Sequence, residues 1–180
     1  MLAETLLALA CPEFGLADYE QIQLWRREHD APRADQFLPH FTLVRPVGGW
    51  KQGAFIREIQ ARLAGQEPFE IVLSRAVSQP DAQSGAVMDW LVPSIGREAL
   101  SALQDQLYAG ALAPERQAGP AAMPHITIGR GTDVAASQAR MAALEETGLS
   151  IRCLASAVQI VRIKGERVKL LERIPLGREA

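Results

Sequence analysis

The chain has 180 residues, enough for one domain or for one domain with two lobes that share a core. Its composition, 48% hydrophobic and 22% charged, is that of an ordinary globular protein and excludes a disordered or fibrous chain. The net charge of −2 argues against a protein that binds long duplex nucleic acid through many backbone phosphates.

The start of the chain and the cysteines indicate a compartment. The stretch "MLAETLLALAC" lacks the basic beginning of a secretion signal, and its apolar run stops at Pro12. No stretch reaches the roughly 20 apolar residues that a membrane span needs. Cys11 and Cys153 lie in apolar runs without a Cys-x-x-Cys pair, so we expect buried thiols rather than a disulfide framework. We therefore expect a cytoplasmic protein without a membrane partner.

The first half of the chain predicts strand, helix, strand, helix and strand. An apolar run closed by Pro12 is typical of a buried strand, and apolar residues at helical spacing precede Gly65, a helix stop. The stretch "DAPRADQFLP" is expected to be a loop before the middle strand. The five segments cover residues 5–12, 17–29, 38–45, 54–65 and 69–77.

The second half repeats this order. Its first apolar run is expected to end at Pro93, and Thr132 or Asp133 is a plausible N-cap of its second helix. A loop at 113–124 precedes the middle strand. The five segments cover residues 86–93, 97–112, 123–130, 133–148 and 149–158. The pair Gly165-Glu166 between two β-rich runs then predicts a C-terminal hairpin over 157–176.

This repetition predicts a single domain, residues 1–180, built from two intertwined lobes. The lobes correspond approximately to 1–80 and 85–160, with the hairpin added at the end. Matching positions of a duplicated unit face one another across a pseudo-two-fold axis. We therefore expect His40 to lie opposite His125.

One short motif is written twice, as "LPHFTLVR" at 38–45 and "MPHITIGR" at 123–130. Side chains alternate between the faces of a strand, so His40 and Thr42 share one face, as do His125 and Thr127. The chain has only three histidines, and two of them occupy these matching positions. A single copy would be weak evidence, whereas the doubled copy predicts a site with two imidazoles and two hydroxyls.

Such a site suits displacement at phosphorus. Imidazole titrates near pH ~6.5, so one ring can accept a proton while the other donates one, and hydroxyls can hold the phosphate oxygens. The sequence has no His-x-His or His-Glu-x-x-His spacing for a metal, and no P-loop or dinucleotide fingerprint. We therefore expect chemistry with no metal and no cofactor.

The paired "HFTL" and "HITI" segments resemble those of the 2H phosphoesterase superfamily, and most closely its bacterial 2′-5′ RNA ligase and cyclic phosphodiesterase group. The resemblance covers nearly the whole chain. It implies a bilobal α+β fold, in which two antiparallel sheets line a central cleft and helices pack outside. It also implies a metal-independent phosphodiesterase that opens 2′,3′-cyclic phosphates of nucleotides or RNA ends to 2′-phosphates, with 2′-5′ RNA ligation as a possible reverse reaction.

The resemblance also implies roles for individual residues. His40 and His125 would be the acid–base pair, Thr42 and Thr127 would bind the phosphate, and Arg130 would contact substrate. Which histidine is the base stays open.

Arg45 is a second candidate for substrate binding. Strict alternation turns both Arg45 and Arg130 away from the histidine face, unless a bulge re-aims them. Either arginine can instead pair with a surface carboxylate.

Two further questions stay open at this level. Trp50, Phe14 and Phe37 are candidates for stacking on a nucleobase, although a Trp beside glycines is as often a cap on the core. The alternative to an enzyme is a nucleotide-binding module that keeps the cleft without turnover. In both cases the expected partner is a nucleotide or an RNA terminus, and the expected state is a monomer.

Overall fold

The computed structural model describes residues 4–81, 84–117 and 123–177. The helices are α1 (Leu16–His29), α2 (Ala31–Gln36), α3 (Gln52–Leu63), α4 (Arg97–Leu107) and α5 (Val134–Glu146), with a 3₁₀ turn at Ala113–Glu115. The strands are β1 (Glu4–Ala10), β2 (Glu13–Phe14), β3 (Phe41–Gly48), β4 (Phe69–Pro80), β5 (Val87–Ile95), β6 (Ile126–Gly131), β7 (Ile151–Ala155), β8 (Ala157–Lys164) and β9 (Arg167–Pro175).

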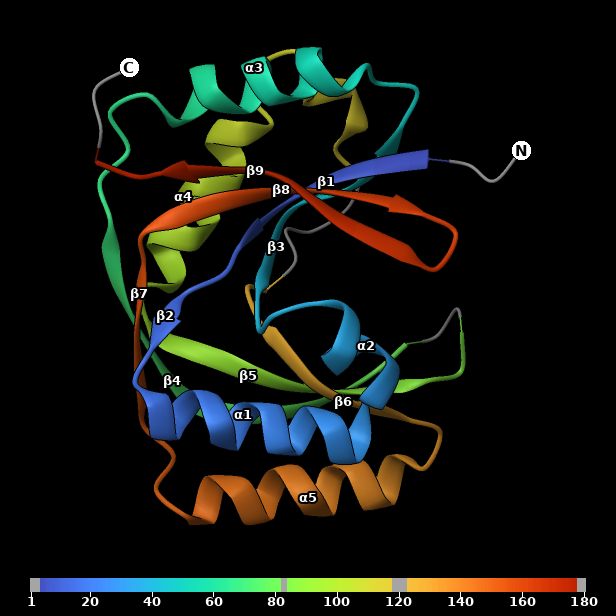
Figure 1. The fold of residues 1–180 in the computed structure, drawn as a ribbon. Coiled ribbons are helices and arrows are strands. Elements are labelled where there is room, and N and C mark those ends of the chain that lie inside the picture. Colours follow the sequence, from blue (N-terminus) through green and yellow to red (C-terminus); the bar gives the residue numbers. More distant parts are fainter. Residues whose placement is uncertain (1–3, 82–83, 118–122, 178–180) are drawn as a thin grey trace.

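These strands form two antiparallel sheets, so the predicted α+β fold is confirmed. The first sheet has the order β3-β1-β8-β9, and the second has the order β2-β7-β4-β5-β6. Each sheet takes strands from both halves of the chain. Figure 1 shows α1 and α5 beside the second sheet, and α3 and α4 at the far end beside the first. Strands β3 and β6 are edge strands of the two sheets.

The chain changes sheets where the sequence analysis expected one continuous strand. Residues 149–158 were predicted as a single strand, but the ladder breaks at Ser156: β7 belongs to the second sheet and β8 to the first. The chain also changes sheets between β1 and β2, at Pro12. The Ser156 hydroxyl donates to the Glu13 carboxylate, which ties the two crossings together.

Two other local expectations were wrong. The segment predicted as a loop before His40 contains the short helix α2, with Pro32 in its first turn, where a missing N–H costs nothing. Pro93 does not end its strand: β5 continues to Ile95, and Pro93 pairs with Leu73 at a register irregularity of the ladder. Proline is tolerated inside a sheet at such a position because a regular hydrogen bond is already missing there.

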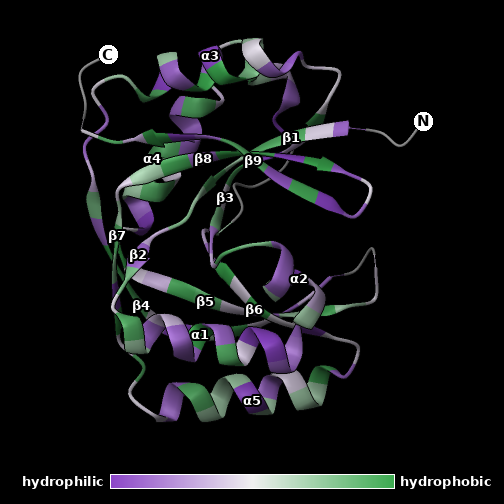
Figure 2. Ribbon diagram, viewed as in Figure 1, coloured by the Kyte–Doolittle hydropathy of each residue, from purple (hydrophilic) through white to green (hydrophobic). Residues whose placement is uncertain are grey.

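The core lies between the sheets and their helices. The helix α4 buries Leu100, Leu103 and Leu107, which recur at helical spacing as predicted. The N-cap of α5 is Asp133, whose side chain accepts from the Ala136 amide at 3.0 Å. Figure 2 shows long hydrophobic stretches on the central strands, while hydrophilic and hydrophobic residues alternate along the helices. Within the described residues, no helix is long and apolar enough to cross a membrane.

Candidate functional site

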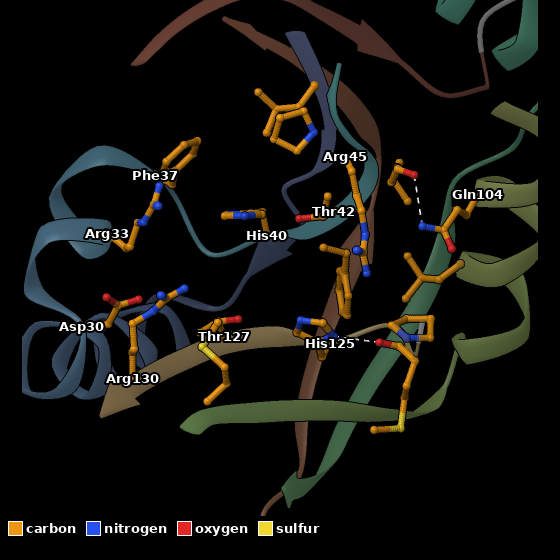
Figure 3. A pocket seen from close by; sticks show the side chains of 18 of the residues that line it. Asp30, Arg33, Phe37, His40, Thr42, Arg45, Gln104, His125, Thr127 and Arg130 are labelled. Carbon is orange, nitrogen blue, oxygen red and sulfur yellow. Dashed lines mark hydrogen bonds between the residues drawn. The ribbon is translucent and has the colours of Figure 1, made fainter. Parts of the chain in front are cut away.

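The two His-x-Thr motifs line one cavity of about 470 Å³, between the edge strands β3 and β6. His40 and His125 each stand immediately before their strand, and Thr42 and Thr127 each follow two residues later. Figure 3 shows both histidine rings and both threonines directed into the same space. The structure therefore brings together the four residues that the sequence pattern singled out.

The two imidazoles are held in the same way. His40 Nδ1 lies 2.7 Å from the carbonyl oxygen of Leu38, and His125 Nδ1 lies 2.7 Å from that of Met123. A carbonyl only accepts, so Nδ1 carries a proton and donates in each ring. In the neutral ring Nε2 is then the basic nitrogen, and no hydrogen bond from the described residues occupies it. Each ring is thus oriented to exchange a proton with a ligand through Nε2.

A bulge after each threonine turns the arginine back towards the cavity. In the first sheet Leu9 pairs with Thr42 and Ala8 with Val44, so Leu43 is the extra residue. In the second sheet the ladder shifts in the same way at Ile128, between Thr127 and Gly129. An extra residue reverses the alternation. The two bulges therefore place Arg45 and Arg130, which alternation alone would face away, on the cavity wall.

Side chains of the neighbouring elements satisfy the bulged backbone of β3. Gln104 of α4 donates to the Leu43 carbonyl at 3.1 Å, and the Tyr108 hydroxyl accepts from the Arg45 amide at 3.0 Å. The Arg45 guanidinium donates to Gln117 Oε1. A bulge leaves ladder groups unpaired, so these contacts fix its shape and hold the direction of Arg45.

The electrostatic surroundings favour the neutral form of both histidines. The pKa of His40 is lowered from 6.5 to about 4, chiefly by burial. The Leu38 hydrogen bond opposes this shift, and the nearby charges of Arg26, His125 and Arg33 add to it. Burial also lowers the pKa of His125, with a contribution from Arg45. A bound phosphate anion would oppose both shifts, because it stabilises the protonated rings.

Trp90 is a site residue that the sequence analysis missed. Its ring stacks on the His125 imidazole, with centroids 3.7 Å apart and planes 11° from parallel. It lies on β5 directly opposite Thr127, so only the pairing of two strands brings it to the histidine. Its Nε1 is buried and has no hydrogen-bond partner among the described residues. The stack holds the plane of the His125 ring, and an aromatic face also stabilises an imidazolium.

Of the three candidates for base stacking, Phe37 alone lines the cavity, and its ring centroid lies 5.4 Å from that of His40. Trp50 packs edge-on against Phe55 and donates from Nε1 to Glu115, so it covers the core. Phe14 also packs on the core.

The cysteines and carboxylates offer no second reactive centre in the described part of the chain. Burial raises the pKa of Cys11 and Cys153 to about 12, so both stay protonated at neutral pH. No group of three or more His, Cys, Asp or Glu side chains in the described ranges is arranged to hold a metal ion.

Comparison with known proteins identifies the family of the chain. The family model of the 2′-5′ RNA ligase superfamily matches residues 14–167. The chain belongs to the 2′-5′ RNA ligase superfamily. Membership of this superfamily of 2H phosphoesterases supports a phosphodiesterase-type activity. None of the curated proteins matches the chain by sequence.

Solved structures share the fold over nearly their whole length. E. coli LigT in its apo form aligns with a TM-score of 0.62 at 19% identity, covering 99% of this chain and 100% of that chain. A structure described as a phosphoesterase aligns with a TM-score of 0.61 at 19% identity, covering 97% and 99%. Kluyveromyces marxianus Usb1 aligns with a TM-score of 0.55 at 12% identity, covering 96% and 98%. At these identities the alignments show that the three solved proteins and this chain have the same fold.

Proposed function

We propose that this protein is a metal-independent phosphodiesterase that opens 2′,3′-cyclic phosphates of nucleotides or RNA ends to 2′-phosphates. The observation that carries the proposal is the pair of histidines, His40 and His125. Their Nδ1 atoms are held by carbonyls and their Nε2 atoms are free to exchange protons in one cavity. Arginines and threonines line the same space, as an anionic phosphate requires.

The reaction needs one base, one acid and donors around phosphorus. One histidine takes a proton from water, whose oxygen forms a new bond to phosphorus. The bond from phosphorus to the ribose 3′ oxygen breaks, and the other histidine gives that oxygen its proton. Thr42, Thr127 and Arg45 donate to the non-bridging oxygens, where charge accumulates. The same step with a 5′-hydroxyl in place of water as the nucleophile would join two RNA ends through a 2′-5′ bond and leave a 3′-hydroxyl.

The different surroundings of the histidines support an assignment of their roles. His40 faces two arginines, which disfavour its protonated form, so it is suited to be the base. His125 is stacked on Trp90, whose ring favours an imidazolium, so it is suited to be the acid.

A cyclic phosphate with sulfur in place of the 3′ oxygen tests these roles. A thiolate leaves without needing a proton, so this substrate should restore much of the rate lost in His125→Ala and little of that lost in His40→Ala. The opposite pattern would exchange the two roles.

The ligands of structural relatives support a nucleotide substrate. E. coli LigT has been solved in complex with phosphate, with 3′-AMP, with ATP and with NADP+. Kluyveromyces marxianus Usb1 has been solved with uridine monophosphate. A nucleotide fits the present cavity in kind, because Phe37 and aliphatic side chains offer apolar surface beside the cationic groups.

The direct test is turnover of 2′,3′-cyclic nucleotides in the presence of a chelator, with the phosphate position of the product read by NMR. His40→Ala and His125→Ala should each lower kcat by about 10²–10⁴-fold. His29→Ala is the matched control, because His29 lies outside the cavity lining and should leave kcat unchanged. If mononucleotides bind by calorimetry but no cyclic phosphate is opened, the protein is a nucleotide-binding module and the enzyme proposal is wrong.

A further inference from the structure

Three arginines converge at the end of the cavity next to α1 and α2. Arg26 comes from α1, Arg33 from α2 and Arg130 from the end of β6, and we call these three residues the arginine cluster. Figure 3 shows Arg33 and Arg130 beside the single carboxylate of Asp30, on the opposite side of the histidines from Gln104. Burial raises the pKa of Asp30, and the charges of the arginine cluster oppose this rise. Three guanidinium groups therefore face one carboxylate.

The positive charge of Arg26 is buried, and it forms no ion pair with a carboxylate of the described residues. The charge of Asp30 supports it only in part, because Arg33 and Arg130 share the same carboxylate. Only 2% of Arg26 is exposed, and its guanidinium donates to Gln23 Oε1 at 2.5 Å and to the Arg33 carbonyl at 3.1 Å. Both acceptors are neutral. A buried charge is costly unless a charge of opposite sign compensates it, and burial accordingly lowers the pKa of Arg26. An anion at this end of the cavity would provide that compensation.

Arg33 and Arg130 are available to bind such an anion. Neither makes an ion pair with a carboxylate of the described residues. The Arg33 guanidinium lies over the Phe37 ring, 5.8 Å from its centroid, which positions it without using its donors. Planar guanidinium groups bind phosphate oxygens in pairs, so two of them with free donors make a phosphate site.

We propose that the arginine cluster is a subsite for a second phosphate of the substrate, the one attached to the 5′ oxygen of the nucleoside that carries the cyclic phosphate. The inference rests on the proposed function, in which the two histidines and threonines hold the reacting phosphate. Such a second phosphate occurs both as a 5′-monophosphate and as the next phosphodiester of an RNA terminus. A cyclic nucleotide with a free 5′-hydroxyl leaves the cluster with Asp30 as its one facing negative charge among the described residues and is the poorer substrate.

The test compares kcat/KM for three substrates. These are adenosine 2′,3′-cyclic phosphate, its 5′-phosphorylated form and the adenosine dinucleotide ending in the same cyclic phosphate. The readout is the gain in kcat/KM over the first substrate, measured within each variant so that general damage cancels. We expect a gain of about tenfold or more in the unaltered protein. Gain with the 5′-monophosphate, with the dinucleotide or with both supports the subsite and tells which source it accepts. No gain with either overturns it.

Variants of the arginine cluster test whether the gain in kcat/KM depends on its guanidinium groups. Arg33→Met and Arg130→Met keep an aliphatic stem and remove the charge, and each should reduce the gain to about twofold or less. Arg27→Met is the matched control on α1, because Arg27 is exposed and does not line the cavity, and it should keep the full gain. A gain that persists in both cluster variants, or that is lost equally in Arg27→Met, contradicts the proposal.

A binding measurement separates failure of the subsite from failure of the proposed function. If no cyclic phosphate is turned over, calorimetry with adenosine 5′-monophosphate and with adenosine still tests the arginine cluster. The monophosphate should bind at least tenfold more tightly, and Arg33→Met should remove the difference. Equal affinities for the two ligands would overturn the subsite whatever the activity of the protein.

Discussion

Substitution of Gly129 by alanine tests the packing beneath the second His-x-Thr motif. A Cβ at this position would lie 2.6 Å from Asp89 Oδ2 and 3.0 Å from His29 Cβ, closer than side chains tolerate. Asp89 cannot move away easily. It is 1% exposed, accepts from Ser137, and is bound by Arg140 Nη2 at 2.7 Å. The added methyl group must therefore displace β6 from β5 or break a buried hydrogen-bond network.

The structure sets the size of this effect. Overpacking of a rigid site costs about 1–3 kcal/mol, and the anchored carboxylate places Gly129→Ala towards the upper part of that range. Gly131→Ala is the matched control two residues along the same strand, because its Cβ would meet no atom within 4 Å and its φ is not positive. There alanine restricts the unfolded chain and stabilises by up to about 1 kcal/mol. Two alanine substitutions in one strand are thus expected to change the free energy of unfolding in opposite directions.

Equilibrium unfolding in urea, followed by circular dichroism, measures both free energies. Gly129→Ala should unfold at a lower urea concentration than the unaltered protein, and Gly131→Ala at an equal or higher one, with similar slopes. In an Asp89→Ala background the cost of Gly129→Ala should shrink, since the atom it collides with is gone. Equal midpoints for the two glycine variants would refute the reasoning, because they would mean that a Cβ at position 129 does not collide with Asp89.

Three further predictions concern the histidines. Because burial lowers the pKa of His40 from 6.5 to about 4, the unfolded chain binds more protons than the folded one between these pH values. The free energy of unfolding should therefore fall as pH drops from 6.5 to 4. In urea titrations at several pH values, His40→Asn should flatten this fall. Since the pKa of His125 is lowered as well, kcat/KM for a cyclic nucleotide should peak below pH 6.5. The maximum of kcat should lie at higher pH, because bound phosphate favours the protonated rings. A kcat/KM maximum above pH 8 would contradict this prediction. With Trp25 and Trp50 replaced by Phe, the emission of Trp90 should decrease as the stacked His125 becomes protonated, and the titration should disappear in His125→Asn.

Much of the fold and the centre of the site followed from local patterns. The order of helices and strands, the hairpin and the N-cap at Asp133 depend on residues close in sequence, because hydrophobic period, proline and capping groups act over a few residues. The doubled motif identified His40 and His125 for the same reason: it is a local pattern that occurs twice. Such predictions failed where a residue is compatible with two local structures. Proline can end a strand or lie at an irregularity within one, and Pro93 does the second.

The tertiary structure alone decided which residues surround the histidines. The alternation of side chains between the two faces of a strand is a local property. The bulges that re-aim Arg45 and Arg130 are defined only against a partner strand. Trp90 reaches His125 through strand pairing, and Arg26 reaches the cavity through the packing of α1 beside β6. The physical reason is that register and packing minimise the free energy of the whole chain. Residues distant in sequence thereby acquire shared surroundings that no single segment encodes.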